Sequence, residues 1–170
     1  MTAERQLLVV RHAKSDQNAG VADHERPLND RGRRDAPALG RWLTEHGLRP
    51  DLVLCSSAER ARQTWELAAA ELDDAPPVDV RDALYETSAS GVLTQLREVD
   101  DHVRVVAVVG HEPTQSAVAS ALAGSADPRA EQALREGFTT SGVAVLELAG
   151  PWRELAPGSC RLTAFAAPRG

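Results

Sequence analysis

Three aliphatic runs, at residues 7–10, 52–55 and 103–109, constrain the fold of this 170-residue chain more than any other feature. They consist mainly of leucine and valine, and they are too short for helices with a partly polar surface. Such runs are typical of strands that are buried on both faces of a sheet. Residues 142–148 and 161–166 predict two later strands.

Helical patterns separate these runs. Asn29 or Asp30 can cap a helix that carries Leu39 and Leu43, with Ala36, on one face, and Gly47 ends it. Further helices are predicted over residues 57–72, 90–99, 113–123 and 128–135. Strands that alternate with helices predict an α/β sandwich with a largely parallel sheet. No repeat or long linker divides the sequence, so we expect one domain over residues 1–170.

Composition and cysteine spacing exclude several classes of protein. The formal net charge of −6 at pH 7 argues against general nucleic-acid binding. No apolar stretch is long enough to cross a bilayer, and the polar residues 1–6 predict no signal peptide. Cys55 and Cys160 lie far apart and predict neither a disulfide nor a zinc site. We therefore expect a cytoplasmic protein with reduced thiols, in which Cys55 serves packing. The oligomeric state is left open.

Candidate functional residues follow the three aliphatic runs. The first run leads into Arg11 and His12, the second into a segment containing Arg60, and the third into His111. Ligands of open α/β sheets bind outside the carboxyl ends of the strands. If the three strands are neighbours, these side chains form a site.

The residue types indicate phosphoryl chemistry at this site. Arginine grips phosphate oxygens with a planar, permanently charged fork, and a neutral imidazole is a competent nucleophile. His12 must then be neutral, with a backbone carbonyl fixing its tautomer, and His111 can donate to a phosphoryl oxygen. Taken singly, each residue also fits a strand end, a helix surface or a turn. The other histidines have no partner at metal-ligand spacing, and neither a metal nor a cofactor is expected; they are His24, His46 and His102.

At these residues the sequence resembles the histidine phosphatase superfamily, also called the phosphoglycerate mutase-like superfamily. Arg11-His12-Ala13 is similar to its Arg-His-Gly signature. Residues 56–64 resemble the second-arginine motif of the family, and residues 109–113 resemble its second-histidine motif. Within the superfamily, residues 8–15, 23–32 and 84–86 resemble the SixA-type phosphohistidine phosphatases. The resemblance covers about residues 7–125 and implies a three-layer α/β/α sandwich around a mostly parallel mixed sheet.

The resemblance also implies roles for individual residues. His12 would be the phosphorylated nucleophile, Arg11 and Arg60 would bind phosphoryl oxygens, and His111 would stabilise the transferring group. Asn18 falls where many members have an asparagine near the phosphate.

The general acid is the point at which this sequence departs from the family pattern. Many members use a carboxylate to protonate an alcohol leaving group. Glu86 is the candidate here, Asp16 is a weaker one, and Glu86 also fits a solvated loop. A phosphohistidine can leave as neutral imidazole without such an acid. The expected substrate is therefore phosphohistidine on a protein. A phosphatase for small phosphate esters and a non-catalytic phosphate-binding module remain as alternatives.

Overall fold

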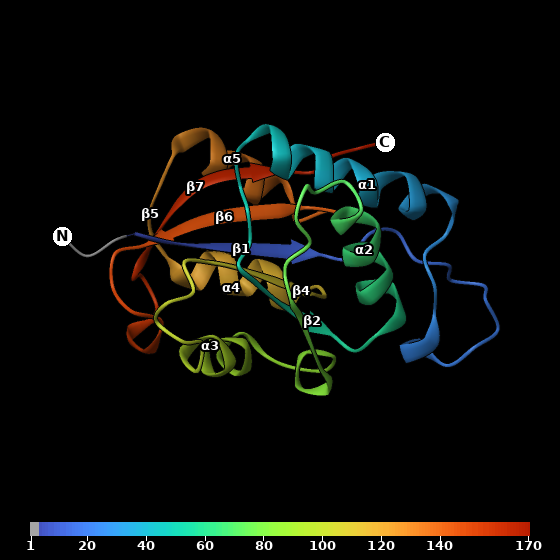
Figure 1. The fold of residues 1–170 in the computed structure, drawn as a ribbon, viewed down its shortest axis with the longest axis horizontal. Coiled ribbons are helices and arrows are strands. Elements are labelled where there is room, and N and C mark those ends of the chain that lie inside the picture. Colours follow the sequence, from blue (N-terminus) through green and yellow to red (C-terminus); the bar gives the residue numbers. More distant parts are fainter. Residues whose placement is uncertain (1–3) are drawn as a thin grey trace.

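The computed structural model describes residues 4–170. The polar segment 1–6 was predicted not to be a signal peptide, and its residues 1–3 lie outside the described part. Seven strands of the described chain form one sheet in the order β3-β2-β4-β1-β6-β7-β5 (Figure 1). The strands are β1 (Arg5–Arg11), β2 (Leu52–Ser56), β3 (Val78–Arg81), β4 (Val105–Gly110), β5 (Ala123–Ala126), β6 (Val143–Leu148) and β7 (Cys160–Ala166).

The sheet is mixed and mostly parallel, as predicted. β3, β2, β4 and β1 pair in parallel. β6 is antiparallel to both of its neighbours, β1 and β7, while β5 is parallel to β7. Because β2, β4 and β1 are adjacent and point the same way, their carboxyl ends meet at one edge. The adjacency that the site prediction assumed is therefore present.

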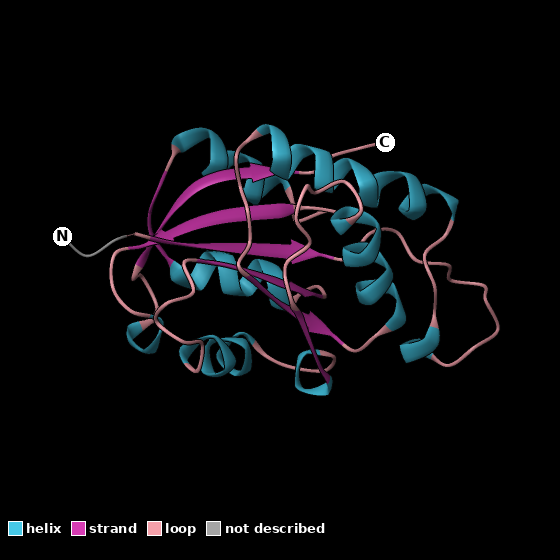
Figure 2. Ribbon diagram, in the orientation of Figure 1, coloured by secondary structure: helices cyan, strands magenta, loops and turns pink. Residues whose placement is uncertain are grey.

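Helices cover both faces of this sheet (Figure 2). They are α1 (Asp30–Glu45), α2 (Glu59–Ala69), α3 (Ala89–Arg97), α4 (Thr114–Leu122) and α5 (Pro128–Glu136), with short 3-10 turns at Asp23–Glu25, Asp82–Leu84 and Trp152–Glu154. Side chains of α1 and α2 share one buried cluster with Leu8 and Val10, whereas those of α3, α4 and α5 share another with Leu7 and Val9. Successive strand residues point to opposite faces. The aliphatic runs are continuous because both faces are covered, and the three-layer α/β/α prediction is confirmed.

The first helix follows its sequence signals closely. The Asn29 side chain accepts the N–H of Gly32 at 2.9 Å, which caps α1. Leu39 and Leu43 are fully buried. Gly47 follows the helix with φ +64°, a conformation that suits glycine, and so it ends the helix as predicted.

The sequence patterns predict neither of the two edge strands, β3 and β5. β3 alternates valine with charged residues, and it therefore lacks the continuous apolar run of a central strand. β5 has the sequence Ala-Gly-Ser-Ala, which contains no β-branched residue, and its first residue lies inside the predicted helix 113–123. Both strands lie at the two ends of the sheet, where tertiary pairing outweighs intrinsic propensity.

Candidate active site

The candidate site lies where β1, β2 and β4 end. Arg11 is the last residue of β1, and Gly110 is the last of β4. The backbone N–H of His12 donates to the Gly110 carbonyl at 3.0 Å, which fixes the two strand ends relative to each other. A hollow of about 210 Å³ opens here, lined by Arg11, His12, Lys14, Ser15, Gln17, Arg26, Arg60, His111, Glu112 and Thr140. The structure thus brings together the four residues that the strand ends predicted.

The His12 ring is held in one tautomer. Its Nδ1 lies 2.7 Å from the carbonyl oxygen of Ala13, so Nδ1 carries the proton and Nε2 keeps a lone pair. Ala13 is fixed in turn, because its N–H donates to Thr64 Oγ1 of α2 at 2.9 Å. Burial is the main cause that lowers the pKa of His12 to about 3, so the ring is neutral near pH 7. The predicted contact between His12 and a backbone carbonyl is present.

His111 faces His12 across the hollow, with 5.2 Å between the ring centroids. Its Nε2 lies 2.8 Å from Oγ of Ser56, the last residue of β2. Its Nδ1 is buried and has no hydrogen-bond partner among residues 4–170. Burial first, and then the charge of Arg60, lower the pKa of His111 to about 4. If the Ser56 hydroxyl donates to Nε2, then Nδ1 holds the proton and can donate it to a ligand.

Arg60 projects from the first turn of α2 and is only 6 % exposed. Its two terminal nitrogens donate to Asp23, to the carbonyl oxygen at 2.7 Å and to Oδ2 at 3.1 Å. The Tyr85 hydroxyl donates to the same Oδ2 at 2.5 Å. The hydrogen bond from Tyr85, followed by those from Arg26 and Arg60, holds the pKa of Asp23 well below its usual range. Asp23 is therefore an ionised anchor that orients the Arg60 fork.

Arg11 is anchored by the loop that precedes β6. One of its terminal nitrogens donates to the Phe138 carbonyl at 2.8 Å, and burial lowers its pKa. Its Nε, like that of Arg60, is buried without a partner in the described chain. The N–H of Ser141 donates to the His12 carbonyl at 3.2 Å, and Ser141 has φ +60°, which is unusual for a residue with a side chain. The same loop thus contacts both Arg11 and His12.

The C-terminal segment braces this loop. Arg169 donates to the Thr140 carbonyl at 2.7 Å and to Thr139 Oγ1 at 3.2 Å. Its guanidinium also lies 3.7 Å from the buried carboxylate of Asp35, a residue of α1. The same carboxylate accepts the N–H of Gly170 at 3.0 Å. Figure 1 shows this end of the chain beside α1. The segment therefore connects α1 to the loop that holds Arg11.

The other sequence-predicted residues lie elsewhere. Glu86 and Asn18 are exposed, and neither lines the catalytic hollow. Asp16 is also absent from the lining, and its carboxylate accepts the N–H of Asn18 at 2.8 Å. The general acid role of Glu86 and the phosphate contact of Asn18 stay predictions. Cys55 is fully buried, and burial raises the pKa of its thiol to about 12, which agrees with a packing role.

Sequence reasoning gave no role to several residues in or beside the site, among them Asp23, Arg26, Ser56 and Glu112. Arg26 lines the hollow and donates to Ser15 Oγ at 2.7 Å and to Asp23 Oδ1 at 2.9 Å. Asp23 and Arg26 fall within residues 23–32, which carried the family resemblance but were given no role. Ser56 and Glu112 adjoin predicted residues, so their positions in the sequence could have identified them.

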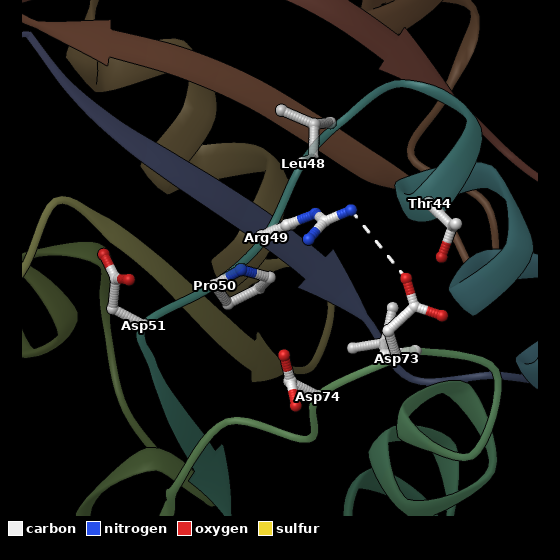
Figure 3. A pocket seen from close by; sticks show the side chains of 8 residues that line it. Thr44, Leu48, Arg49, Pro50, Asp51, Asp73 and Asp74 are labelled. Atoms are coloured by element: carbon white, nitrogen blue, oxygen red, sulfur yellow. Dashed lines mark ion pairs between the residues drawn. The ribbon is translucent and has the colours of Figure 1, made fainter.

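A second hollow, of about 220 Å³, lies at the opposite edge of the sheet, where the chain enters β2 (Figure 3). Its charged side chains pair with one another, for Arg49 lies 3.8 Å from Asp73 and both are largely exposed. It contains no histidine and shares no residue with the hollow at His12. The candidate site therefore stays at the strand ends.

Residues 4–170 lack two kinds of feature. They contain no group of three or more histidine, cysteine or acidic side chains placed to hold a metal ion. They also contain no helix with the length and apolarity that crossing a membrane requires.

Comparison with known proteins gives concordant results. Residues 7–102 match the histidine phosphatase superfamily (branch 1). An uncharacterised protein of Mycobacterium tuberculosis, Rv1276c, is 43 % identical over 162 residues, which are 94 % of this chain and all of that protein. A structure from Nakamurella multipartitia, assigned as a phosphohistidine phosphatase SixA, is 35 % identical with a TM-score of 0.85. The match covers 98 % of this chain and 97 % of the chain in that structure. A structure from Agrobacterium tumefaciens with the same assignment is 31 % identical with a TM-score of 0.81, and the match covers 96 % of this chain and 98 % of the other.

Proposed function

The chain belongs to the histidine phosphatase superfamily and is of the SixA type, and from that premise we propose that it is a metal-independent phosphatase for phosphohistidine on proteins. Family membership and the SixA-type neighbours support phosphatase activity in general. One observation carries the finer proposal. The His12 Nδ1 is engaged by the Ala13 carbonyl, which leaves the Nε2 lone pair free, and His12 lines the same hollow as Arg11 and Arg60. That arrangement is suited to attack on phosphorus.

The first step is transfer of the phosphoryl group to His12. The lone pair on Nε2 attacks phosphorus, a P–N bond forms, and the bond from phosphorus to the substrate's imidazole breaks. The bonding pair leaves with that imidazole, which is neutral when its other ring nitrogen carries a proton. Arg11 and Arg60 both line the hollow, where their guanidinium groups can bind the equatorial oxygens of the phosphoryl group.

The second step returns the enzyme to its resting state. A water molecule attacks the phosphorus on His12, the P–N bond breaks, and its electron pair returns to Nε2 as phosphate leaves. With the Ser56 hydroxyl donating to its Nε2, His111 assists both steps, because its Nδ1–H can then form a hydrogen bond to a phosphoryl oxygen as charge builds there. Its low pKa keeps His111 neutral near pH 7, so it acts as a hydrogen-bond donor.

The carboxylates near the site support phosphohistidine as the substrate. Glu112 lines the hollow, but its two oxygens accept the N–H and the hydroxyl of Ser116, each at 2.7 Å. Asp23 is engaged by Arg26, Arg60 and Tyr85, which hold it ionised. Neither carboxylate is suited to protonate an alkoxide, which is a poor leaving group. A neutral imidazole needs no such acid, and this supports phosphohistidine over a phosphate ester.

We place this activity in the cytoplasm. Support comes from Cys55 and Cys160, which are both buried and both free. Disulfides are rare in that compartment, where thiols stay reduced.

Turnover of two substrates in EDTA tests the substrate proposal. The assay compares a histidine-phosphorylated protein with p-nitrophenyl phosphate, for wild type and for Glu86→Gln. We expect the kcat/KM of wild type to be larger for the phosphoprotein than for the ester. We expect Glu86→Gln to have the same kcat/KM as wild type for each substrate. Faster ester turnover that collapses in Glu86→Gln would identify an acid and overturn the phosphohistidine proposal. Binding of vanadate without turnover of either substrate would indicate a phosphate-binding module instead.

A further inference from the structure

Residue 14 is the only lysine among the 19 lysine and arginine residues of the sequence. It is also one of the residues that line the hollow at His12. At every other position where the chain has one of these two residues, on the surface and in the site alike, the residue is arginine. The single ammonium side chain of the protein therefore lies beside the candidate nucleophile.

The backbone of Lys14 is held firmly in place. Its carbonyl accepts the N–H of Asn29 at 3.0 Å, and the next residue, Ser15, is buried. The first turn of α1 packs so closely on the same carbonyl that a Cβ atom at Gly32 would clash with its oxygen. The side chain of Lys14 thus starts from a fixed point two residues after His12.

The ammonium group of Lys14 is not engaged by the described chain. The side chain is half-buried, and it has no hydrogen bond or ion pair with any group of residues 4–170. The other cations of the hollow differ, because each of them donates to an oxygen of the chain; they are Arg11, Arg26 and Arg60. The donors of Lys14 are therefore available to a ligand.

The charges of the hollow fit a dianion only when Lys14 is included. Its lining contains four cationic side chains, which are Arg11, Lys14, Arg26 and Arg60. Two carboxylates oppose them, Glu112 in the lining and Asp23, which pairs with two of the arginines. Two positive charges remain in excess, and the phosphoryl group of a phosphorylated side chain carries about −1.5 to −2 near pH 7. Without Lys14 the excess would be one charge.

An ammonium group suits this place better than a fourth guanidinium. It is compact, it carries three N–H donors, and it ends a flexible four-carbon stem. It can therefore follow a phosphoryl oxygen while phosphorus moves from the imidazole of the substrate toward Nε2 of His12. The planar forks of the arginines are held by their contacts with the chain, so they mark one fixed position for the oxygens.

We propose that the Lys14 ammonium binds a phosphoryl oxygen, as a third cation beside Arg11 and Arg60, and stays bound while the group is transferred to His12. Its role during transfer rests on the proposed phosphatase function, whereas its binding of the anion does not. In the first step its charge offsets that of the phosphoryl group as Nε2 approaches phosphorus. In the second step it holds the group on His12 while water attacks. Lys14 is thus a further substrate-binding residue of the site.

Calorimetric titration with orthovanadate tests this contact without any turnover. We expect Lys14→Met to raise the Kd for vanadate by about tenfold or more, because a hydrogen bond to a charged group is lost together with its charge. Lys14→Arg should recover part of the affinity. Arg33→Met is the matched control, because Arg33 is an exposed cation of α1 outside the lining of the hollow, and its Kd should stay near that of wild type. An equal Kd for wild type and Lys14→Met would overturn the proposal.

High salt separates a direct contact from long-range attraction. In about 1 M KCl the Debye length falls to about 3 Å, so a charge that only attracts anions from a distance loses its effect. We expect the Kd of Lys14→Met to stay more than about threefold above that of wild type under these conditions. Equal values in high salt would reduce Lys14 to a steering charge and overturn the contact.

Acetylation of the single lysine tests the contact on the wild-type protein, whether or not the variants fold. Sulfo-NHS-acetate modifies amines, and peptide mass spectrometry reads the rate at Lys14 with the α-amino group as the internal reference. With vanadate at about ten times its Kd, about one-tenth of the sites are free, so the rate at Lys14 should fall by about tenfold while the reference rate is unchanged. Equal rates at Lys14 with and without vanadate would overturn the proposal.

Failure of this proposal and failure of the proposed phosphatase function give different results. A wild type that binds vanadate through Lys14 but turns over neither phosphoprotein nor ester would contradict the phosphatase function and leave this inference standing. A wild type that turns over phosphoprotein, with unaltered vanadate binding in Lys14→Met, would overturn this inference alone.

Discussion

Replacement of Arg60 by alanine tests whether catalysis depends on charge that is oriented before the substrate arrives. Arg60 is 6 % exposed, and its terminal nitrogens are held by two oxygens of Asp23. Each terminal nitrogen keeps one further N–H that can bind a phosphoryl oxygen. Alanine would leave the developing charge without this fork.

The expected loss follows from similar preorganised donors. Removal of one such donor costs about 10²–10³ in rate, or about 2.7–4 kcal/mol. We expect Arg60→Ala to lower kcat/KM by about the same factor, since its charge and its hydrogen bonds are lost together. Arg60→Lys should recover only part of the loss, because an ammonium keeps the charge but lacks the planar fork that binds two phosphoryl oxygens at once.

The assay is steady-state turnover of the histidine-phosphorylated protein, with the folded fraction checked by urea unfolding. Arg62→Ala is the matched control. Arg62 lies two residues further along α2, its side chain is 55 % exposed, and it pairs with Glu59 outside the catalytic hollow. It should leave kcat/KM nearly unchanged. A loss for Arg60→Ala below about threefold, or about 0.6 kcal/mol, would refute the role of Arg60.

Three further outcomes are expected. Ser56→Ala should lower kcat and should lower the free energy of unfolding by about 1 kcal/mol, because the Nε2 of His111 loses its partner. An unchanged kcat with the same loss of stability would show that Ser56 contributes to folding only. Arg169→Ala should raise the Ki for vanadate by roughly tenfold or less, because the loop that anchors Arg11 loses its brace, and an unchanged Ki would contradict the link. Between pH 6.5 and about 3 the unfolded chain protonates at His12 while the folded chain does not, so stability should fall as pH falls through this window. An NMR signal of His12 that titrates near pH 6.5 in the folded protein would contradict its neutral burial.

The central strands and the positions of the candidate site residues could be predicted because each depends on a local pattern. Val9 and Val10 belong to an aliphatic run that only a sheet covered on both faces can bury. His12 and His111 follow such runs directly, and strand ends are where α/β sheets bind ligands. The single domain over residues 1–170 stays a prediction.

Contacts between distant segments could not be predicted in this way. Asp23 reaches Arg60 across 37 residues, and Arg169 reaches Thr140 across 29. Nothing in either local sequence specifies its partner. Glu112 illustrates the same limit, since its carboxylate adjoins His111 in sequence yet is engaged by Ser116 one helical turn away. The edge strand β3 depends on its pairing with β2 and not on its own composition.

Rapid-quench trapping of the phosphoenzyme, in EDTA, with a ³²P-labelled histidine-phosphorylated substrate tests directly whether His12 is the nucleophile. We expect a label on wild type that is stable in base and lost in acid, that maps to His12 by peptide mass spectrometry, and that is absent in His12→Ala. Substrate turnover by wild type with no labelled enzyme at any quench time, or by His12→Ala at the wild-type rate, would contradict it.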